Sequence, residues 1–292
     1  MPAKIILDTD IGDDIDDAFA LALVVSSAEL ELVGVTTVHG PVEKRARIAR
    51  KLLNRAGAVD IPVIPGFHGC GSEDHEPNQA VWAAGTGLQP PAQAAVDYIL
   101  EEIEAAPGEI AVVAIGPLSN IGKCIETESA IVGKIAELVI MGGSVRRGYG
   151  DASRPEVEYN IGCDPAAARK VFESGVKLTV VPLDATRVLE LPREQIRALE
   201  SSGAALAHAV TQLLVLWQGT GQRLPVLHDP LAVAAVFDRT IGRFEPMRLE
   251  VTSDGWTVER PGGPANASVC LEADANRLFD LVIGRIAGRE AP

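Results

Sequence analysis

The chain lacks several features that would assign it at once to a common class of protein. No run of about 18 consecutive apolar residues occurs in its 292 residues, so neither a transmembrane helix nor a membrane partner is expected. The segment Met1–Lys4 has no apolar leader, which favours a cytoplasmic location. Basic residues number 26 against 40 acidic ones, for a net charge of −14, and this deficit argues against nucleic acid as a partner.

The cysteines are few, and they lack the close pairing that metal sites and disulfide frameworks need. We interpret Cys70, Cys124, Cys163 and Cys270 as buried thiols in a reducing compartment. The composition, 47% hydrophobic and 23% charged, is that of an ordinary globular protein. With no linker or repeat in view, we predict a single domain over residues 1–292.

Short β-branched or aliphatic runs alternate with longer stretches of helical period, which predicts βαβ units and a parallel sheet. The predicted strands are Lys4–Leu7, Leu30–Thr37, Ile61–Ile64, Ile110–Ile115, Leu138–Met141 and Leu178–Pro182. The predicted helices between them are Ile15–Ser27, Val42–Ala56, Ala92–Ala106, Ser119–Ile125 and Pro165–Ser174. The fold class is therefore α/β, with a mostly parallel central sheet flanked by helices.

After Pro182 the pattern changes to added C-terminal helices and a small hairpin. The expected elements are helices near Arg193–Ser201, Ala204–Trp217 and Asp274–Ala287, a helix starting at Asp229, and a hairpin over Leu249–Arg260 that turns at Asp254-Gly255. Earlier in the chain, Gly66–Pro91 and Gly142–Val157 are long segments rich in glycine, proline and polar residues. Loops of this length are often functional, and both follow strands, where an open α/β sheet has its ligand crevice.

The most unusual feature is the segment Asp8–Asp17, which has six carboxylates in ten residues and no Lys or Arg between Ile5 and Val42. Helix N-termini favour acids because of their exposed N–H groups, but this accounts for only one or two carboxylates. So much like charge needs a nearby cation. Oxygen-only ligands suit a hard cation, and six to eight flexible oxygens are typical of Ca²⁺. The segment predicts a metal site with Ca²⁺ as the cofactor.

Three further motifs precede helices or follow loops. Taken alone, His228-Asp229-Pro230 is typical of a helix start with proline at its first position. The segment Gly116–Asn120 fits either an ordinary strand-to-helix junction or a free backbone carbonyl that meets a ligand. Glu158 and Asn160 lie on the same side of an extended chain, where they could grip a polyhydroxyl ligand.

Taken together, these motifs resemble the nucleoside hydrolase family, the inosine–uridine preferring type of N-ribohydrolase. The similarity spans nearly the whole chain, from Ile5 to the terminal helix. The matching blocks are, in order, Asp8-Thr9-Asp10-Ile11-Gly12 with Asp16-Asp17-Ala18, Gly34-Val35-Thr36-Thr37, Gly116-Pro117-Leu118-Ser119-Asn120, Met141-Gly142-Gly143, Glu158-Tyr159-Asn160 and His228-Asp229-Pro230. The resemblance implies a Rossmann-related α/β fold and a homodimer or homotetramer.

The resemblance also implies the roles of individual residues. It places one Ca²⁺ at the bottom of the active site, with its ligands from Asp10, Asp17, Asp229 and the main-chain carbonyl of Ile115. It assigns contacts with the ribose hydroxyls to Asp16, Glu158 and Asn160, with Asp8 in a supporting position behind the metal. Because two extra residues separate Gly12 from Asp16-Asp17 relative to the shortest family form, Asp14 is an alternative to either acid.

The implied reaction is hydrolysis of the N-glycosidic bond of a ribonucleoside, which yields free base and ribose. The resemblance makes Asp10 the catalytic base that takes a proton from a metal-bound water. His228 has a suitable ordinary pKa range to protonate the leaving base. Trp82 and Trp217 are most often packing residues, and stacking on a purine is the alternative.

This chain departs from the family pattern at two places. Pro41 stands where the family often has Asn or Asp, and His39 beside it is a candidate to compensate. The loop Gly142–Val157 has no clear match to a ribose-binding Asn, and the candidates for that space are Arg146, Arg147 and Asp151. The pattern leaves the preferred base open.

Two other functions compete with hydrolysis of a nucleoside. A Mg²⁺-dependent phosphatase of the haloacid dehalogenase type also has Asp-x-Asp after its first strand, but the acids of Asp8–Asp17 would repel a phosphate. A ribose- or nucleoside-binding protein that keeps the metal site without turnover is the second candidate, motivated by Pro41 and the altered loop. A hydrolase of a non-standard riboside would share the main mechanism.

Overall fold

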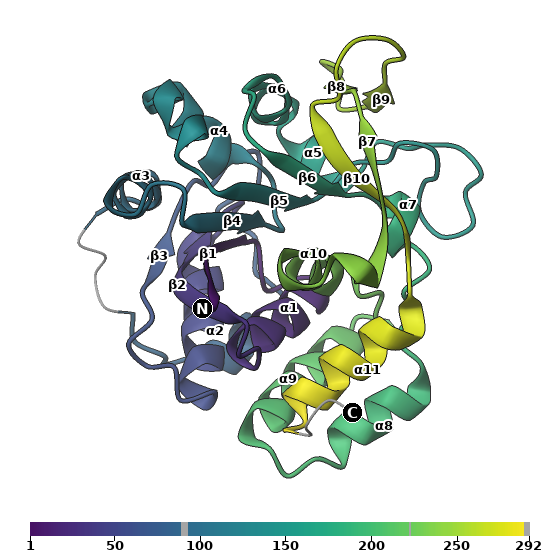
Figure 1. Ribbon diagram of the computed structural model, residues 1–292. Coiled ribbons are helices and arrows are strands. Elements are labelled where there is room, and N and C mark those ends of the chain that lie inside the picture. The colour runs from purple at the N-terminus through teal and green to yellow at the C-terminus, as the bar shows by residue number, and fades with distance from the viewer. Residues whose placement is uncertain (89–92, 222, 289–292) are drawn as a thin grey trace.

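The computed structural model describes residues 1–88, 93–221 and 223–288. Within these residues the main sheet has the strand order β3-β2-β1-β4-β5-β6-β10-β7 (Figure 1). The strands are β1 Ala3–Thr9, β2 Leu30–Thr37, β3 Val63–Pro65, β4 Ile110–Ala114, β5 Glu137–Met141, β6 Leu178–Val181, β7 Gly242–Met247 and β10 Ala267–Ala273. Neighbouring strands pair in parallel except β10 with β7, so the predicted mostly parallel sheet is confirmed.

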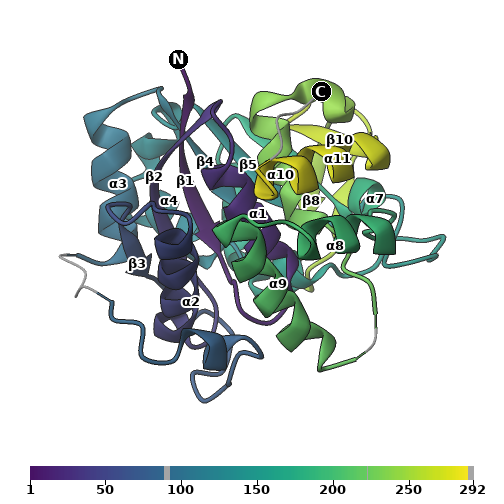
Figure 2. The same cartoon turned by 90° about the horizontal axis from the view of Figure 1, so that it is seen from below.

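Helices cover both faces of this sheet, as Figures 1 and 2 show. One face carries α1 Asp16–Val25, α2 Val42–Arg55 and α10 His228–Phe237, with α8 Arg193–Glu200, α9 Ala205–Gln218 and α11 Ala275–Ile286 packed outside them. The other face carries α3 Ala95–Ala105, α4 Ser119–Thr127 and α6 Pro165–Glu173. Successive strand residues point to opposite faces, so Ile5 and Leu7 of β1 join the first core and Ile6 joins the second.

The order of the strands determines where a ligand can bind. From β1 the chain runs outward through β2 to β3, and it then crosses to the other side of β1 to form β4. The ends of β1 and β4 therefore lie side by side, with Asp8 paired to Ala114 and the Ile115 N–H donating to the Asp8 carbonyl at 2.8 Å. In an open α/β sheet the crevice beyond such a reversal is the usual ligand site.

Most predicted elements are present, with shifted ends. The predicted strand Ile61–Ile64 is observed at Val63–Pro65, and the predicted hairpin consists of β8 Leu249–Val251 and β9 Thr257–Glu259. The helix predicted from Ala92 begins at Ala95, and Ala92 itself lies outside the described residues. The last residues of the predicted loop Gly66–Pro91 also lie outside them.

The strands β7 and β10 and two short α-helices were not predicted. The strand β7 contains Pro246, which a sheet tolerates only at an edge or bulge, and β7 is indeed the edge strand beside β10. The short helices are α5 Tyr159–Cys163 and α7 Leu183–Thr186. Each has fewer residues than the helical period needs to produce a visible pattern.

The prediction of an extended chain over Glu158-Tyr159-Asn160 is wrong beyond its first residue. Glu158 is extended, but α5 begins at Tyr159, because the Glu158 carboxylate accepts the N–H groups of Asn160 and Ile161 at 2.9 and 3.1 Å. This is the role of a helix N-cap. Glu158 and Asn160 still face one pocket, but from a capped helical turn rather than from one side of a strand.

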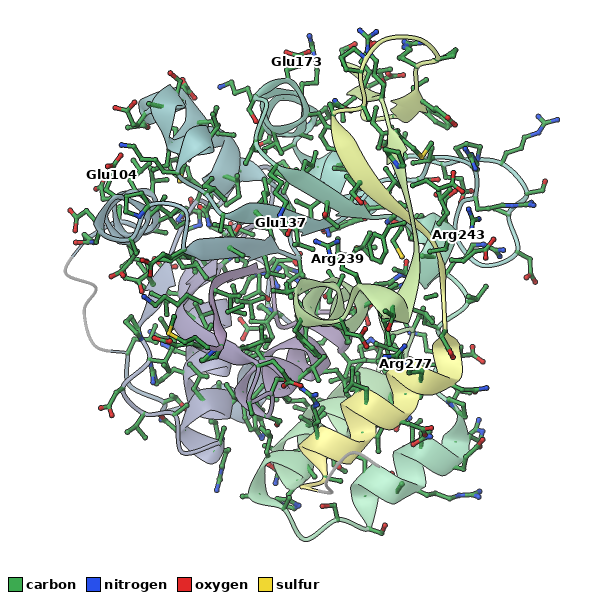
Figure 3. All side chains as sticks on the ribbon, viewed as in Figure 1. Glu104, Glu137, Glu173, Arg239, Arg243 and Arg277 are labelled. Atoms are coloured by element: carbon green, nitrogen blue, oxygen red, sulfur yellow. The ribbon has the colours of Figure 1, made fainter. Side chains whose placement is uncertain are left out.

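Away from this crevice, the sheet carries ion pairs near the start of its strands. Glu137 at the beginning of β5 pairs with Arg239 and accepts a hydrogen bond from the Thr179 hydroxyl at 2.6 Å (Figure 3). Although burial alone would raise it, these partners hold the pKa of Glu137 below its ordinary value. Among the described residues, no helix is both long enough and apolar enough to cross a lipid bilayer.

Candidate active site

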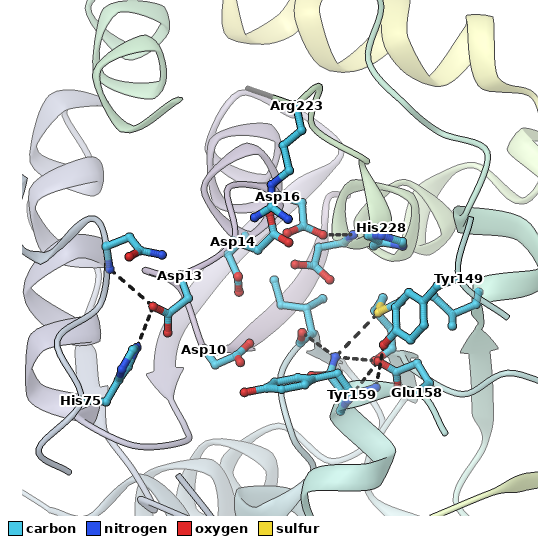
Figure 4. A pocket seen from close by; sticks show the side chains of 17 residues that line it. Asp10, Asp13, Asp14, Asp16, His75, Tyr149, Glu158, Tyr159, Arg223 and His228 are labelled. Atoms are coloured by element: carbon cyan, nitrogen blue, oxygen red, sulfur yellow. Dashed lines mark hydrogen bonds and ion pairs between the residues drawn. The ribbon is translucent and has the colours of Figure 1, made fainter. Parts of the chain in front are cut away.

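A pocket of about 430 Å³ opens at the carboxyl ends of the parallel strands (Figure 4). Side chains from well-separated segments line it, which is possible because the ends of β1, β4, β5 and β6 meet at one edge of the sheet. The predicted site residues among them are Asp10, Asp14, Asp16, Asp17, Ile115, Glu158, Asn160, His228 and Asp229. Further lining residues that were not predicted are Asp13, His75, Asn78, Met141, Tyr149, Tyr159, Leu183 and Arg223.

Three buried carboxylates form the tightest group in this pocket. Oxygens of Asp16, Asp17 and Asp229 lie within 4.8 Å of one another. Asp16 and Asp17 begin α1, and Asp229 is in the first turn of α10, which packs against α1. Burial, reinforced by the neighbouring acids, raises the pKa of all three carboxyls well above the usual range. A bound cation would remove this penalty, and these residues therefore could hold a metal ion.

Asp10 lines the same pocket but is not part of that tight group. Asp8, two residues earlier in β1, is fully buried. Its Oδ1 accepts hydrogen bonds from Thr36 at 2.6 Å and Asn120 at 2.7 Å. Its Oδ2 has no hydrogen-bond partner among the described residues. Burial raises the pKa of Asp8 to about 7 and that of Asp10 to about 6. An orphaned oxygen beneath a ring of acids fits a site built around a cation.

The donor set consists of oxygen atoms. Besides the carboxylates, the pocket is lined by Ile115 at the end of β4, whose carbonyl accepts a hydrogen bond from the Asn160 side-chain amide at 3.0 Å. That amide also donates to the Met141 carbonyl at 3.1 Å. Asn160 thus fixes the ends of β4 and β5 relative to each other. Hard cations with flexible coordination, Ca²⁺ first among them, are the ions that such oxygen ligands suit.

Besides any metal ion, the acidic segment Asp8–Asp17 has a positively charged side chain beside it, which comes from α2. Arg45 is buried, and its guanidinium donates to the carbonyls of Asp10 and Ile11 and, at 2.9 Å, to the Asp13 carboxylate. His75 Nε2 lies 2.8 Å from the other oxygen of Asp13. Although burial opposes the shift, the His75 hydrogen bond and the Arg45 charge hold the pKa of Asp13 below its ordinary value.

The acidic segment Asp8–Asp17 also anchors the loop that follows β3. The Gln79 N–H donates to the Gly12 carbonyl at 3.0 Å, and the Gln79 amide donates to the Asp14 carbonyl at 2.8 Å. Gly12 has φ of +133°, a conformation open to glycine, and an added Cβ would lie 2.9 Å from Ile48. Asp14 faces the pocket on the same side as Arg223 (Figure 4).

His228 lies beside the acids at the start of α10. Its Nδ1 is 2.7 Å from the Thr186 hydroxyl, and burial lowers its pKa to about 4. At neutral pH the ring is therefore neutral. The sequence-based expectation of an ordinary histidine pKa is wrong here, because α7 and α10 enclose the ring.

The structure does not bring the two tryptophans into the pocket. The Trp82 indole donates to Gln212 at 2.7 Å, and Lys51 lies 4.5 Å from its ring centroid, so Trp82 packs α9 against the loop before α3. Trp217 is 2% exposed, with the Arg223 guanidinium 4.6 Å from its ring centroid. The group that enters the pocket is consequently Arg223 rather than an indole ring.

The loop Gly142–Val157 contributes a tyrosine rather than the predicted charged residues. Arg146 pairs with Glu259 on β9 at 3.3 Å, and Arg147 reaches the Ser153 carbonyl within the loop. Neither is among the described residues that line the pocket, nor is Asp151. Tyr149 lines it, and its hydroxyl accepts the Tyr159 N–H at 2.8 Å.

His39 does not compensate for Pro41 at the acidic cluster. Its carbonyl accepts the Arg45 Nε–H at 2.7 Å, while its ring turns toward the Tyr159 hydroxyl, 3.0 Å from Nε2. Pro41 precedes α2, where a missing N–H costs no helical hydrogen bond, and its carbonyl accepts from Lys44 and Arg45.

Comparison with known proteins identifies the family of this chain. Residues 5–280 match the family model for inosine-uridine preferring nucleoside hydrolases. The chain is 34% identical to the inosine-uridine preferring nucleoside hydrolase of Leishmania major, with 97% of each chain covered. It is 33% identical to a non-specific ribonucleoside hydrolase of Klebsiella pneumoniae, over 94% of this chain and 95% of that one.

Among solved structures, a plant nucleoside hydrolase superposes with a TM-score of 0.88 at 25% identity, covering 98% of this chain and 99% of its own. The purine-preferring ribonucleoside hydrolase of Gardnerella vaginalis gives a TM-score of 0.84 at 25% identity, with 98% of each chain covered. The chain therefore belongs to the inosine-uridine preferring nucleoside hydrolase family and is a hydrolase that acts on N-glycosyl compounds.

Proposed function

We propose that the protein hydrolyses the N-glycosidic bond of ribonucleosides in a Ca²⁺-dependent reaction that yields free base and ribose. The observation that carries this proposal is the group of buried carboxylates of Asp16, Asp17 and Asp229, in the same pocket as Asp10. The family match supplies the reaction class, and the oxygen-rich donor set supplies the choice of metal.

The metal ligands in this proposal are Asp10, Asp17, Asp229 and the Ile115 carbonyl, all of which line the pocket. When bound, Ca²⁺ would supply positive charge that polarises a water molecule and orients the ribose hydroxyls. Asp16 belongs to the tight carboxylate group as well, so its oxygens lie where both the ion and a sugar hydroxyl can be reached. Asp14 is the alternative at this position.

Asp10 is the proposed general base. It directly follows β1, its carbonyl is fixed by the Arg45 guanidinium, and the residue lines the pocket. It would take a proton from the attacking water as the N-glycosidic bond breaks. The surrounding carboxylates would then stabilise the positive charge that develops on the ribosyl group.

Glu158 and Asn160 are the proposed contacts to the ribose hydroxyls. The Glu158 carboxylate is held in place by the N–H groups of Gly143, Asn160 and Ile161 at 2.9 to 3.1 Å. Because burial raises its pKa to about 7, Glu158 can accept or donate a hydrogen bond near neutral pH. Asn160 is fixed by the carbonyls of Ile115 and Met141.

At the leaving base, His228 would act as a neutral hydrogen-bond donor. If the Thr186 hydroxyl donates to Nδ1, the remaining ring hydrogen is on Nε2, from which it can be donated. Arg223 offers a second, positively charged donor to a base that leaves with negative charge. Tryptophan stacking has no place in this arrangement, since neither predicted indole is among the described lining residues.

The test is release of free base and ribose from a panel of purine and pyrimidine nucleosides, with and without a Ca²⁺ chelator. We expect hydrolysis that the chelator abolishes and that Ca²⁺ restores. Tight binding of a ribose analogue without base release would support the binding-protein alternative. Turnover of a phosphomonoester with Mg²⁺, and of no nucleoside, would support the phosphatase alternative.

We also propose that residues 1–292 act as one domain, because β10 pairs with β6 and thereby joins the end of the chain to the sheet that carries the pocket. The homodimer or homotetramer implied by the resemblance stays a prediction. Sedimentation equilibrium of the purified protein tests it directly.

A further inference from the structure

A second cluster of metal-ligand side chains lies beside the pocket and plays no part in the proposed reaction. It consists of His39, Cys70 and Cys163, whose ligand atoms all lie within 4.8 Å of one another. The His39 Nδ1 is 3.8 Å from the Cys70 Sγ. Cys70 is exposed and Cys163 half-buried, so the prediction that all the cysteines are buried is wrong for these two, whereas Cys124 and Cys270 are buried.

The three ligands come from segments that backbone hydrogen bonds and a helix cap hold in place. His39 follows β2, and the chain around Cys70 is bound to it through the His39 N–H on the Phe67 carbonyl at 2.9 Å and the Gly40 N–H on the His68 carbonyl at 2.7 Å. Cys163 ends α5, directly before Asp164, which caps α6. The backbone positions of the three residues are therefore held by the fold.

His39 has a backbone conformation that singles it out. Its φ of 70° is the only positive value among the non-glycine residues that the structure describes. A side chain in this region is strained, and such residues concentrate at functional positions. Here the conformation turns the imidazole toward Cys70, while the His39 carbonyl still reaches Arg45.

The orientation of the imidazole also fits metal binding. The Tyr159 hydroxyl lies 3.0 Å from His39 Nε2 and can accept its hydrogen, which leaves Nδ1 free on the side of the sulfurs. Metal-bound histidines almost always have their second nitrogen held in this way. The two rings meet edge to face, with centroids 5.7 Å apart.

We propose that His39, Cys70 and Cys163 form a second metal site, which takes one Zn²⁺ and is separate from the carboxylates of the pocket. One imidazole nitrogen and two thiolates are zinc ligands of the usual kind, with the fourth position open. Zn–S bonds of about 2.3 Å at tetrahedral angles put ligand atoms roughly 3.5–3.8 Å apart, so the observed cluster needs little rearrangement.

The chemistry of the two sites differs enough for both to be filled at once. Thiolate and imidazole select borderline and soft ions, whereas the oxygens of Asp16, Asp17 and Asp229 select hard ones. The exposed Cys70 gives the ion a path from solvent. Because Tyr159 both holds His39 and lines the pocket, a bound ion would stiffen one wall of the pocket.

The probe is Co²⁺, which reports its ligands through its absorption spectrum. The full-length, reduced protein is saturated with Ca²⁺ and titrated with Co²⁺. We expect a thiolate-to-cobalt charge-transfer band that saturates at about one equivalent and is abolished by equimolar Zn²⁺. A carboxylate site cannot produce this band, so the readout is independent of the proposed hydrolase activity and of the Ca²⁺ site.

The matched variants are Cys70→Ser, Cys163→Ser and, as the control, Cys124→Ser. The first two should lose the charge-transfer band, and Cys124→Ser, a thiol buried elsewhere beside α3, should keep it. Cys70 is exposed, so its variant is expected to fold even if Cys163→Ser does not. Absence of the band in the unmodified protein, or its persistence in Cys70→Ser, would overturn the proposal.

Alkylation provides a second measurement on the unmodified protein. Cys70 is exposed and should react readily with iodoacetamide in the Ca²⁺-loaded, Zn²⁺-free state. One equivalent of Zn²⁺ should slow that reaction at least tenfold, as judged by mass spectrometry of the labelled peptide. An unchanged rate would count against the site.

Discussion

The Arg45 guanidinium lies 2.9 Å from the Asp13 carboxylate, and the Arg45 side chain is only 1% exposed. It also donates hydrogen bonds to the carbonyls of Asp10, Ile11 and His39. The buried Arg45 side chain thus holds the backbone at Asp10, the proposed base, and at His39, a ligand of the proposed zinc site.

Replacing this cation should destabilise the protein strongly. Arg45→Met removes the side-chain donor from three carbonyl groups and leaves Asp13 with His75 as its charged partner, and we expect the free energy of unfolding to fall by about 3 kcal/mol. Urea unfolding measures this. Lys44→Met is the matched control on the same helix: its partner Glu76 is exposed, so the loss should be under about 1 kcal/mol. Equal losses in the two variants would contradict the assigned role of Arg45.

Asp10→Asn should lower turnover severely and leave the fold intact. The amide cannot accept the proton of the attacking water, so kcat should fall by about 10²–10⁴-fold. Thermal unfolding without metal should occur at an equal or higher temperature, because a carboxylate whose pKa is raised by burial has been neutralised. Turnover at the wild-type rate would rule out Asp10 as the base.

His228→Ala should slow substrates according to their leaving groups. Natural nucleosides need help at the base and should lose about 10²–10⁴-fold in kcat, whereas a nitrophenyl riboside, with its good leaving group, should change by less than about tenfold. Thr186→Val, which removes the hydroxyl at Nδ1, is the companion variant and should show the same ranking with smaller effects. An equal loss on both substrates would exclude a role at the leaving group.

Arg223 and Trp82 provide a paired test of what contacts the base. Arg223→Ala should lower kcat/KM at least tenfold, because a charged donor is removed from the pocket. Trp82→Ala should leave kcat/KM within about twofold of the wild-type value, because the indole packs on Gln212 and Lys51 outside the pocket. Steady-state kinetics on inosine and uridine compare the two, and the reverse ranking would restore the stacking hypothesis.

Without metal, the free energy of unfolding should decrease as pH rises, because of the buried acids. Burial raises the pKa of Asp8 and Glu158 to about 7, whereas in the unfolded chain both groups lose their protons near pH 4. Between these values the native state binds more protons than the unfolded state, so the free energy of unfolding falls as pH rises from about 4 to 7.

Calcium should reverse that loss. It competes with protons for its proposed ligands Asp10, Asp17 and Asp229, whose pKa burial also raises, so its stabilising effect should be largest at pH 7 and above, at about 2.7 kcal/mol when free Ca²⁺ is 100 times its Kd. Calorimetric melting at pH 5 and pH 7.5, with chelator or with Ca²⁺, measures both effects. A calcium-induced rise in melting temperature that is larger at pH 5 would contradict this account.

The sequence predicted the sheet and most helices because apolar periodicity and glycine-rich junctions are local signals. The residues themselves singled out the acids of Asp8–Asp17 as a group, since they follow a strand and crowd the start of a helix. Family resemblance was needed for Asp229, because His-Asp-Pro by itself fits an ordinary helix start.

What could not be predicted depends on contacts between distant segments. Arg45 is one of several basic residues on α2, and only the packing of that helix shows that it is buried beneath the turn. Tyr149 and Arg223 are loop residues without a motif. The exposure of Cys70 and the low pKa of His228 likewise follow from neighbours that the sequence does not place.

The Asp229 N–H donates to the Asp16 carboxylate at 3.4 Å across a separation of 213 residues. During synthesis the N-terminal acids therefore exist for most of the chain's elongation without the residues that complete the site. Contacts this distant in sequence form late, after much loop-closure entropy has been lost. The proposed metal site would consequently exist only in the finished fold, and metal affinity would report whether the last third of the chain has docked.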